Sequence, residues 1–172
     1  MIHTPLCDLL GTEFPIIQGA MAHVSTGAFA AAVSGAGGLG VIASSSKDEA
    51  YTREQIKAVR ARTRYPFGVN ITLSNPSEAI VDVILEEGVS IVFTGAGNPA
   101  PYMKDLLSNG CKVIPVVPHV RAAKKMGECC INTDYPNIRT NSSIVLLTWK
   151  RAKRLMVKST TFNYLDTMQV FR

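Results

Sequence analysis

The sequence predicts a parallel α/β fold built from repeated strand–helix units. Five short apolar runs end in small or polar residues, and helix-like stretches separate them. The runs are Pro15–Ala20, Gly38–Ser44, Pro66–Leu73, Ser90–Ala96 and Lys112–Pro118. Strands that alternate with helices favour a parallel sheet, because each return to the same edge needs a crossover connection. A functional site is then expected where the strands end, at the carboxyl edge of the sheet.

Four helices are predicted between these runs. They are Thr26–Ala36, Asp48–Arg62, Ser77–Glu87 and Pro101–Ser108. Ser25 or Thr26 is suited to cap the first helix and Ser77 the third, because short polar side chains accept hydrogen bonds from free amides at helix starts. A fifth helix is expected to begin near Val120.

The length limits how much of a closed barrel the chain supplies. A barrel of eight strand–helix units typically takes about 250 residues, whereas this chain has 172 residues and about five units. All 13 glycines lie at or before Gly127. Residues 128–172 hold seven Lys and Arg against three Asp and Glu, which is four of the five net positive charges. We therefore expect a partial barrel over residues 1–127 and an atypical basic tail over residues 128–172.

Composition narrows the cellular setting. Cys7, Cys111, Cys129 and Cys130 form no metal-ligand or disulfide framework, which fits a reducing compartment. The first residues lack the pattern of a secretory signal, and no apolar run approaches the roughly 20 residues of a membrane span. We expect a cytoplasmic protein with no metal site and with neither nucleic acid nor membrane as a partner.

A glycine pattern before the second strand resembles a dinucleotide fingerprint but has the wrong context. Gly35–Gly40 satisfies G-x-G-x-x-G. That fingerprint binds pyrophosphate only when it follows a strand and opens a helix. Here it follows a predicted helix and leads into a strand, so we interpret it as a helix end and a tight turn at the amino edge of the sheet.

The predicted carboxyl edge carries positions that are suited to a flat ligand. They are Gly19, Ala20 and Met21 after the first strand, Asn70 in the third, and Gly95, Ala96 and Gly97 after the fourth. Small residues let backbone amides come close to a ring, methionine offers a soft apolar surface, and an amide can bond the edge of a heteroaromatic ring. Each loop alone could be an ordinary tight turn. Their shared rim favours one planar ligand.

Four segments in order resemble a known family. They are FPIIQGAMAHVSTGAFAAAVSGAGGLGVIAS, PFGVNITL, VFTGAGNPAPYMKDL and KVIPVVPHVRAAKKM. Over about residues 4–126 the chain resembles the FMN-dependent nitronate monooxygenases, formerly called 2-nitropropane dioxygenases, and within them the enoyl-acyl-carrier-protein reductase II branch. The resemblance implies the N-terminal portion, about five βα units, of a TIM (β/α)8 barrel that holds FMN at the carboxyl ends of its strands.

The resemblance also implies roles and substrates. Gly19, Ala20 and Met21 would line the flavin ring, Asn70 would hydrogen-bond it, and Gly95, Ala96 and Gly97 would pass close to it. The activity would be oxidation of a nitronate with O₂, or reduction of an enoyl thioester with NAD(P)H. The substrate would accordingly be a small molecule or an acyl thioester.

The resemblance stops near residue 127. The family continues with a segment of the type AEGxEAGGHxG, which carries its catalytic histidine, and with glycine-rich loops for the FMN phosphate, and the tail shows neither. We therefore assign no catalytic residue. His23 and His119 lie at the predicted rim and are candidates for contact with a ligand. One hypothesis is that the chain is truncated and the tail is non-native sequence.

Two further readings stay open. A truncated chain could be an inactive fragment, and a homodimer could pair the open edges of the half-barrel. Alternatively, Val145, Trp149, Ala152 and Met156 recur at helical spacing among basic residues. A basic amphipathic helix of that kind would give a non-enzymatic module that binds a membrane or a partner groove.

Overall fold

The computed structural model describes residues 3–44, 48–73, 77–117, 146–147 and 168–170. The elements in chain order are α1 (Pro5–Leu10), β1 (Ile16–Gln18), α2 (Gly27–Gly35), β2 (Gly40–Ala43), α3 (Glu49–Arg60), β3 (Phe67–Thr72), α4 (Glu78–Glu86), β4 (Ile91–Gly95), α5 (Ala100–Ser108), β5 (Lys112–Val117), β6 (Leu146–Leu147) and β7 (Met168–Val170). The five predicted strands and the four predicted helices are confirmed. The helix expected near Val120 lies outside the described residues.

Successive strands pair in parallel, as the strand–helix alternation predicts. The sheet order is β2-β3-β4-β5-β6, and each neighbouring pair is parallel. β1 joins this sheet beside β2 through a parallel bridge between Ile17 and Leu39. β1 also pairs in antiparallel fashion with β7. The five βα-unit strands therefore stand side by side in chain order, as in the first part of a barrel.

The tail meets both edges of this ladder within the described residues. β6 pairs with β5, and β7 pairs with β1. Residues 146–147, which helical spacing assigned to an amphipathic helix, are a short strand instead, because the outer edge of β5 offers them unpaired backbone groups. The rest of that predicted helix lies outside the described part of the chain.

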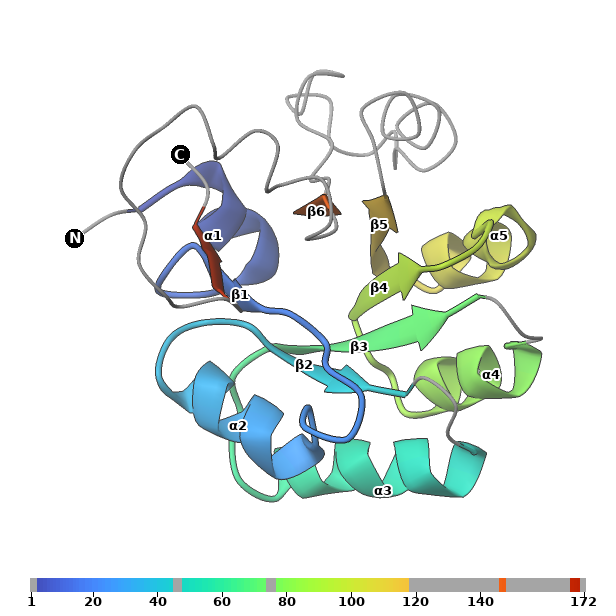
Figure 1. Ribbon diagram of the computed structural model, residues 1–172, viewed down its shortest axis with the longest axis horizontal. Helices are drawn as coiled ribbons and strands as arrows, with labels where there is room; N and C mark the ends of the chain where they lie inside the picture. The colour runs from blue at the N-terminus through green and yellow to red at the C-terminus, as the bar shows by residue number, and fades with distance from the viewer. Residues whose placement is uncertain (1–2, 45–47, 74–76, 118–145, 148–167, 171–172) are drawn as a thin grey trace.

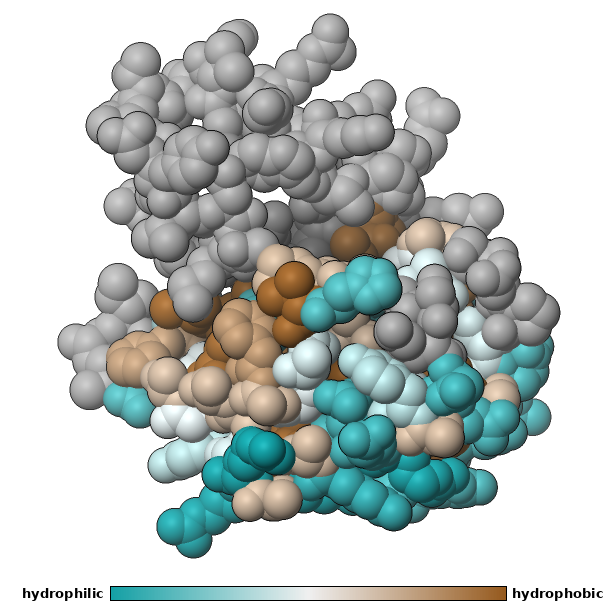
Figure 2. Space-filling model, turned by 60° about the horizontal axis from the view of Figure 1, so that its bottom comes forward, coloured by the Kyte–Doolittle hydropathy of each residue, from teal (hydrophilic) through white to brown (hydrophobic). Residues whose placement is uncertain are grey.

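Helices α2 to α5 cover the outer side of the strands (Figure 1). Apolar residues from both layers form one buried cluster; Ile42, Val69, Ile71 and Val92 come from the strands and Ile56, Val59, Val83 and Ile84 from the helices. The opposite side of α3 and α4 faces solvent, and Figure 2 shows hydrophilic residues gathered over the α3 side of the molecule. Among the described residues, no helix combines the length and apolarity that crossing a membrane requires.

The inner side of the strands packs against α1, which sequence patterns did not predict. Leu6 and Leu10 of α1 join a second buried cluster with Leu39, Ile91 and Ile114, which lie toward the amino ends of their strands. Nζ of Lys112 donates to the carbonyl of Leu9 at 2.5 Å. Helix α1 therefore packs against the inner side of the strands toward their amino ends.

One of the two predicted helix caps is confirmed, because Thr26 caps α2 by accepting from the amide of Phe29. Asp48, for which no cap was predicted, caps α3 by accepting from the amide of Tyr51. The prediction for Ser77 is wrong, because its hydroxyl donates to the carbonyl of Thr72 and makes no side-chain cap of α4.

The glycines between α2 and β2 serve close packing. A Cβ on Gly40 would overlap the carbonyl of Ala30, and Gly37 has a φ of 92° that side chains disfavour. Because α2 ends at Gly35 and β2 begins at Gly40, this pattern lies at the amino edge, as interpreted. It does not open a helix and cannot cradle a pyrophosphate.

Candidate functional site

The carboxyl ends of the parallel strands form one rim. In the sheet register, Asn70 of β3 lies between Ala43 of β2 and Phe93 of β4, and Thr72 pairs with Gly95. Paired residues point to the same side of a sheet. Because Phe93 belongs to the inner cluster, Asn70 and Gly95 also lie on the inner side of the sheet.

Gly95 leaves room on this inner side. Among the described residues, a Cβ added there would meet only the Cβ of Val116, at an ordinary 3.7 Å. Packing within the described part of the chain therefore does not require the lack of a side chain at Gly95.

Gly97 is glycine for a different reason. A Cβ there would lie 2.5 Å from the carbonyl oxygen of Leu73, so the loop after β4 needs a glycine to pass the end of β3. Between the two glycines, Ala96 has a φ of 55°. Only His23, in the loop after β1, shares such a left-handed conformation among the described non-glycine residues. Such conformations cost about 1–3 kcal/mol and are concentrated at functional sites.

The loop after β1 is fixed by a buried pair of polar side chains. Gln18 and Ser25 are each 2% exposed, and Nε2 of Gln18 donates to Oγ of Ser25 at 2.7 Å. Oγ of Ser25 also accepts from the amide of Met21 at 2.8 Å. This contact alters one expectation, because the Met21 amide already has a partner. Met21 can therefore offer a ring its half-buried side chain but not this N–H group.

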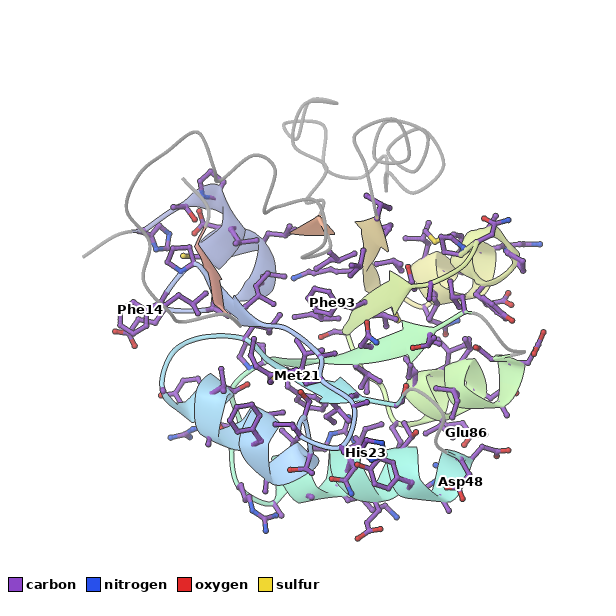
Figure 3. All side chains as sticks on the ribbon, in the orientation of Figure 1. Phe14, Met21, His23, Asp48, Glu86 and Phe93 are labelled. Atoms are coloured by element: carbon purple, nitrogen blue, oxygen red, sulfur yellow. The ribbon has the colours of Figure 1, made fainter. Side chains whose placement is uncertain are left out.

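The register puts Asn70 and Gly95 on the same side of neighbouring strands, and the amide of Ala43 ties the loop after β1 to the end of β2 by donating to the carbonyl of Ser25 at 3.0 Å. In the view of Figure 3, Met21 and Phe93 lie toward the centre of the strands, whereas His23 lies nearer α3. His23 is exposed. His119 lies outside the described residues, so its predicted place at the rim stays a prediction.

Sequence reasoning missed the roles of Gln18 and Ser25. The sequence predicts Ser25 only as an alternative cap of α2 and assigns no role to Gln18. One signal was available, since a glutamine that ends an apolar strand must find hydrogen-bond partners when it is buried.

The chemistry of the rim is that of binding. The seven predicted positions carry no titratable side chain, so they can contact and orient a neutral ring but cannot transfer a proton. The described residues also hold no group of three His, Cys, Asp or Glu side chains that could bind a metal ion. A group that exchanges protons with a substrate would have to come from elsewhere.

A ladder of parallel strands with helices over its outer side and α1 packed against its inner side defines the class: part of a β/α barrel. Comparison with known proteins then shows which family this part of the chain is similar to. Residues 3–81 match the family model for nitronate monooxygenase.

Individual proteins named as nitronate monooxygenases and related enzymes are similar to this chain as well. The chain is 49% identical over 71 residues to a nitronate monooxygenase of Pseudomonas aeruginosa, covering 41% of this chain and 20% of the relative. It is 31% identical over 126 residues to an octahydro-1H-indene-4-carboxyl-CoA dehydrogenase of Mycobacterium tuberculosis, covering 73% and 36%. The solved structure of FabK from Thermotoga maritima superposes with a TM-score of 0.72 at 44% identity, covering 75% of this chain and 42% of that one.

The chain thus spans between a fifth and less than half of these relatives. The family model matches residues 3–81, which hold β1, β2, β3 and the start of α4. The relatives named nitronate monooxygenase and FabK are flavin-dependent.

Proposed function

We propose that this chain provides the flavin-ring side of an FMN-dependent oxidoreductase site. The proposal rests on Gly95. Among the described residues, no atom is so close to Gly95 that a side chain there would clash with it. Asn70 faces the same side of the sheet, two register positions before the partner of Gly95, and Met21 adds an apolar side chain from the loop after β1. Together these residues would hold a flat heteroaromatic ring at the barrel mouth.

Asn70, Met21 and Gly95 would each make a different contact with the flavin ring. Asn70 would orient the ring through its amide, which can both donate and accept a hydrogen bond. Met21 would cover a ring face, and Gly95 would let the ring approach β4. When bound, FMN supplies the two-electron chemistry, and the protein's part is to hold it against the substrate and exclude water.

Two substrate classes follow from the relatives. A nitronate oxidised with O₂ is suggested by the nitronate monooxygenase of P. aeruginosa. An enoyl thioester reduced with NAD(P)H is suggested by the likeness to FabK, and a relative that acts on a carboxyl-CoA supports a thioester. The described rim lacks a feature that would favour one substrate over the other.

The test is FMN binding by the full chain. We expect added FMN to bind, with a change in its visible absorption and a quenching of its fluorescence. Turnover is then assayed with a small alkyl nitronate in air, and with an enoyl thioester plus NADH or NADPH. An FMN titration with no spectral change would contradict the proposal, and FMN binding without either turnover would limit it to the cofactor.

A pair of glycine variants ties the binding to the rim. Gly95→Ala should fold normally, because its Cβ meets only Val116, yet weaken FMN binding about tenfold by filling the ring space, which corresponds to about 1.4 kcal/mol. Gly35→Ala is the matched control: its Cβ would have no described atom within 4 Å, and the residue lies at the amino edge. Equal FMN affinity in the two variants would place the flavin away from Gly95.

A further inference from the structure

The side chain of Gln18 replaces a backbone group in the sheet. The amide of Leu39 donates to the carbonyl of Ile16 at 2.8 Å, and the amide of Gln18 donates to the carbonyl of Leu39 at 2.9 Å. A continued parallel ladder would next send the amide of Val41 to the backbone carbonyl of Gln18. Instead, Val41 donates to Oε1 of Gln18 at 2.9 Å.

This substitution releases the main chain from the sheet without losing the hydrogen bond. β1 ends at Gln18, and the chain turns into the loop of residues 19–25 while β2 continues to Ala43. The other end of the Gln18 amide holds that loop, because Nε2 donates to the carbonyl of Gly19 at 2.5 Å and to Oγ of Ser25 at 2.7 Å. One side chain therefore both ends the strand and sets the direction of the loop.

Ser25 fixes the middle of the same loop. Its Oγ accepts from the amide of Met21, and its own amide donates to the carbonyl of Met21 at 2.9 Å. Its carbonyl accepts from the amide of Ala43 at 3.0 Å, which ties the loop to the end of β2. Both polar groups of the Met21 backbone are thus held by one residue.

We infer that Gln18 and Ser25 are positioning residues that set the place of Met21 at the flavin face. This inference rests on the proposed function for its flavin part, whereas the loop contacts stand on their own. It requires an amide at residue 18, because that position must accept from Val41 and donate to Gly19 and Ser25 at once. A carboxylate has the shape but lacks the donor.

The matched control is a second buried serine at the other end of the sheet. Ser34 is 1% exposed, donates to the carbonyl of Pro66 at 2.8 Å and accepts from the amide of Gly40 at 3.1 Å. Ser34→Ala and Ser25→Ala each remove a buried hydroxyl that both donates and accepts. They should lower the melting temperature alike, so a merely structural role predicts equal behaviour in every other measurement.

Two readouts in the full-length chain test the inference. The first is amide hydrogen exchange of Met21 without flavin: we expect faster exchange, by about tenfold or more, in Ser25→Ala and Gln18→Leu, and no change in Ser34→Ala. The second is FMN affinity and the shape of the bound flavin spectrum, which should change in the first two variants and stay unchanged in the third.

A pH series with Gln18→Glu gives an independent check. Burial beside the Gly19 carbonyl should raise the pKa of this introduced carboxyl, and its protonated form regains a donor. The ratio of the Met21 exchange rate in Gln18→Glu to that in the unaltered chain, measured at the same pH, should then fall toward one as the pH falls.

The outcomes separate the two claims. Unchanged Met21 exchange in both Ser25→Ala and Gln18→Leu overturns the positioning role whatever the flavin does. Failure of the unaltered chain to bind FMN overturns the proposed function and the flavin part of the inference, and the exchange data still judge the loop part. Equal loss of FMN affinity in Ser25→Ala and Ser34→Ala would also overturn the flavin part of the inference, since the loss would then come from general destabilisation.

Discussion

Ser44, directly after β2, gives two hydrogen bonds to one carbonyl of β3. Its hydroxyl donates to the backbone oxygen of Asn70 at 2.6 Å, and its amide donates to the same oxygen at 3.2 Å. Ser44 is 3% exposed. The backbone of the residue proposed to orient the flavin is thus anchored from the neighbouring strand.

Ser44→Ala should therefore affect both stability and ligand binding. Loss of the hydroxyl removes one buried hydrogen bond, so we expect the free energy of unfolding to fall by about 1 kcal/mol. FMN affinity should also fall, because Asn70 is less firmly held. Urea denaturation and FMN titration measure the two effects. Thr12→Val is the control, since Thr12 also donates to a backbone carbonyl, that of Phe14, but precedes β1 at the amino end; weaker FMN binding in Thr12→Val as well would contradict this prediction.

Asn70→Ala should weaken FMN binding with little loss of fold. Asn70 is only half-buried, and its backbone contacts with Ser44 do not depend on its side chain. We expect about tenfold lower affinity, which is the value of a hydrogen bond of about 1.4 kcal/mol. Fluorescence titration measures the affinity, and far-UV circular dichroism controls for folding. Unchanged affinity would remove Asn70 from the site.

Gly40→Ala should disrupt the fold from the opposite end. The new Cβ would overlap the carbonyl of Ala30, where α2 lies directly on β2. Neither backbone can shift without moving a whole element, so we expect a loss of about 3 kcal/mol or more. Gly35→Ala, whose Cβ meets nothing, should be neutral or slightly stabilising. Thermal melts of both variants test the contrast, and similar melting temperatures would refute it.

The ion pairs between α3 and α4 should contribute weakly and depend on salt. Arg53 bonds Glu86 at 2.6 Å and Glu87 at 2.8 Å, and these bonds raise the pKa of its guanidinium. The group stays charged at every accessible pH, so salt is the useful variable. Arg53→Met should lower the melting temperature at low salt. The difference in melting temperature from the unaltered chain should shrink near 1 M NaCl, where the Debye length shortens to about 3 Å. Arg62→Met, which loses only a bond to the Ala58 carbonyl, should show no such salt dependence.

Cys111 should resist alkylation in the folded protein. Burial raises the pKa of its thiol, which donates to the carbonyl of Val89 at 3.3 Å. Iodoacetamide should therefore label this residue in denaturant but not in the native state, as mass spectrometry of its peptide can determine. The same shift fixes a sign for stability. Above the ordinary thiol pKa of about 8.5 the unfolded chain loses its proton first, so stability should fall as pH rises toward the folded pKa. Cys111→Ala should show a shallower fall.

The strands and long helices were predictable because each carries its own local signal. An apolar run with a small or polar end marked β3, and the charged surround of Ile56 and Val59 marked α3. Helix α1 gave a weaker signal, since its six residues are too few for a clear period. Yet Thr4 followed by Pro5, with Leu6 and Leu10 four residues apart, fits a helix start with one apolar face.

The site was predictable in outline but not in its polar detail. Strand order and the parallel rule place Asn70 and Gly95 on one rim. Register was needed to show that both lie on the inner side, and it is set by pairing between strands. The link between Gln18 and Ser25 spans seven residues across a turn, so no periodic pattern marks it. The reason for Gly97 likewise lies in another loop, at Leu73.

Helix α1 gives the two ends of the ladder different tolerance to change. At the amino end, the helix is held against the strands by Leu6, Leu10 and Lys112. A substitution at one of these residues therefore disturbs the packing of the buried inner cluster. At the carboxyl end, Gly95 can gain a methyl group without disturbing its neighbours. Substitutions at the carboxyl end could therefore change ligand preference while the packing of α1 at the amino end stays intact. Directed evolution of this chain should accordingly accumulate functional substitutions at the carboxyl end.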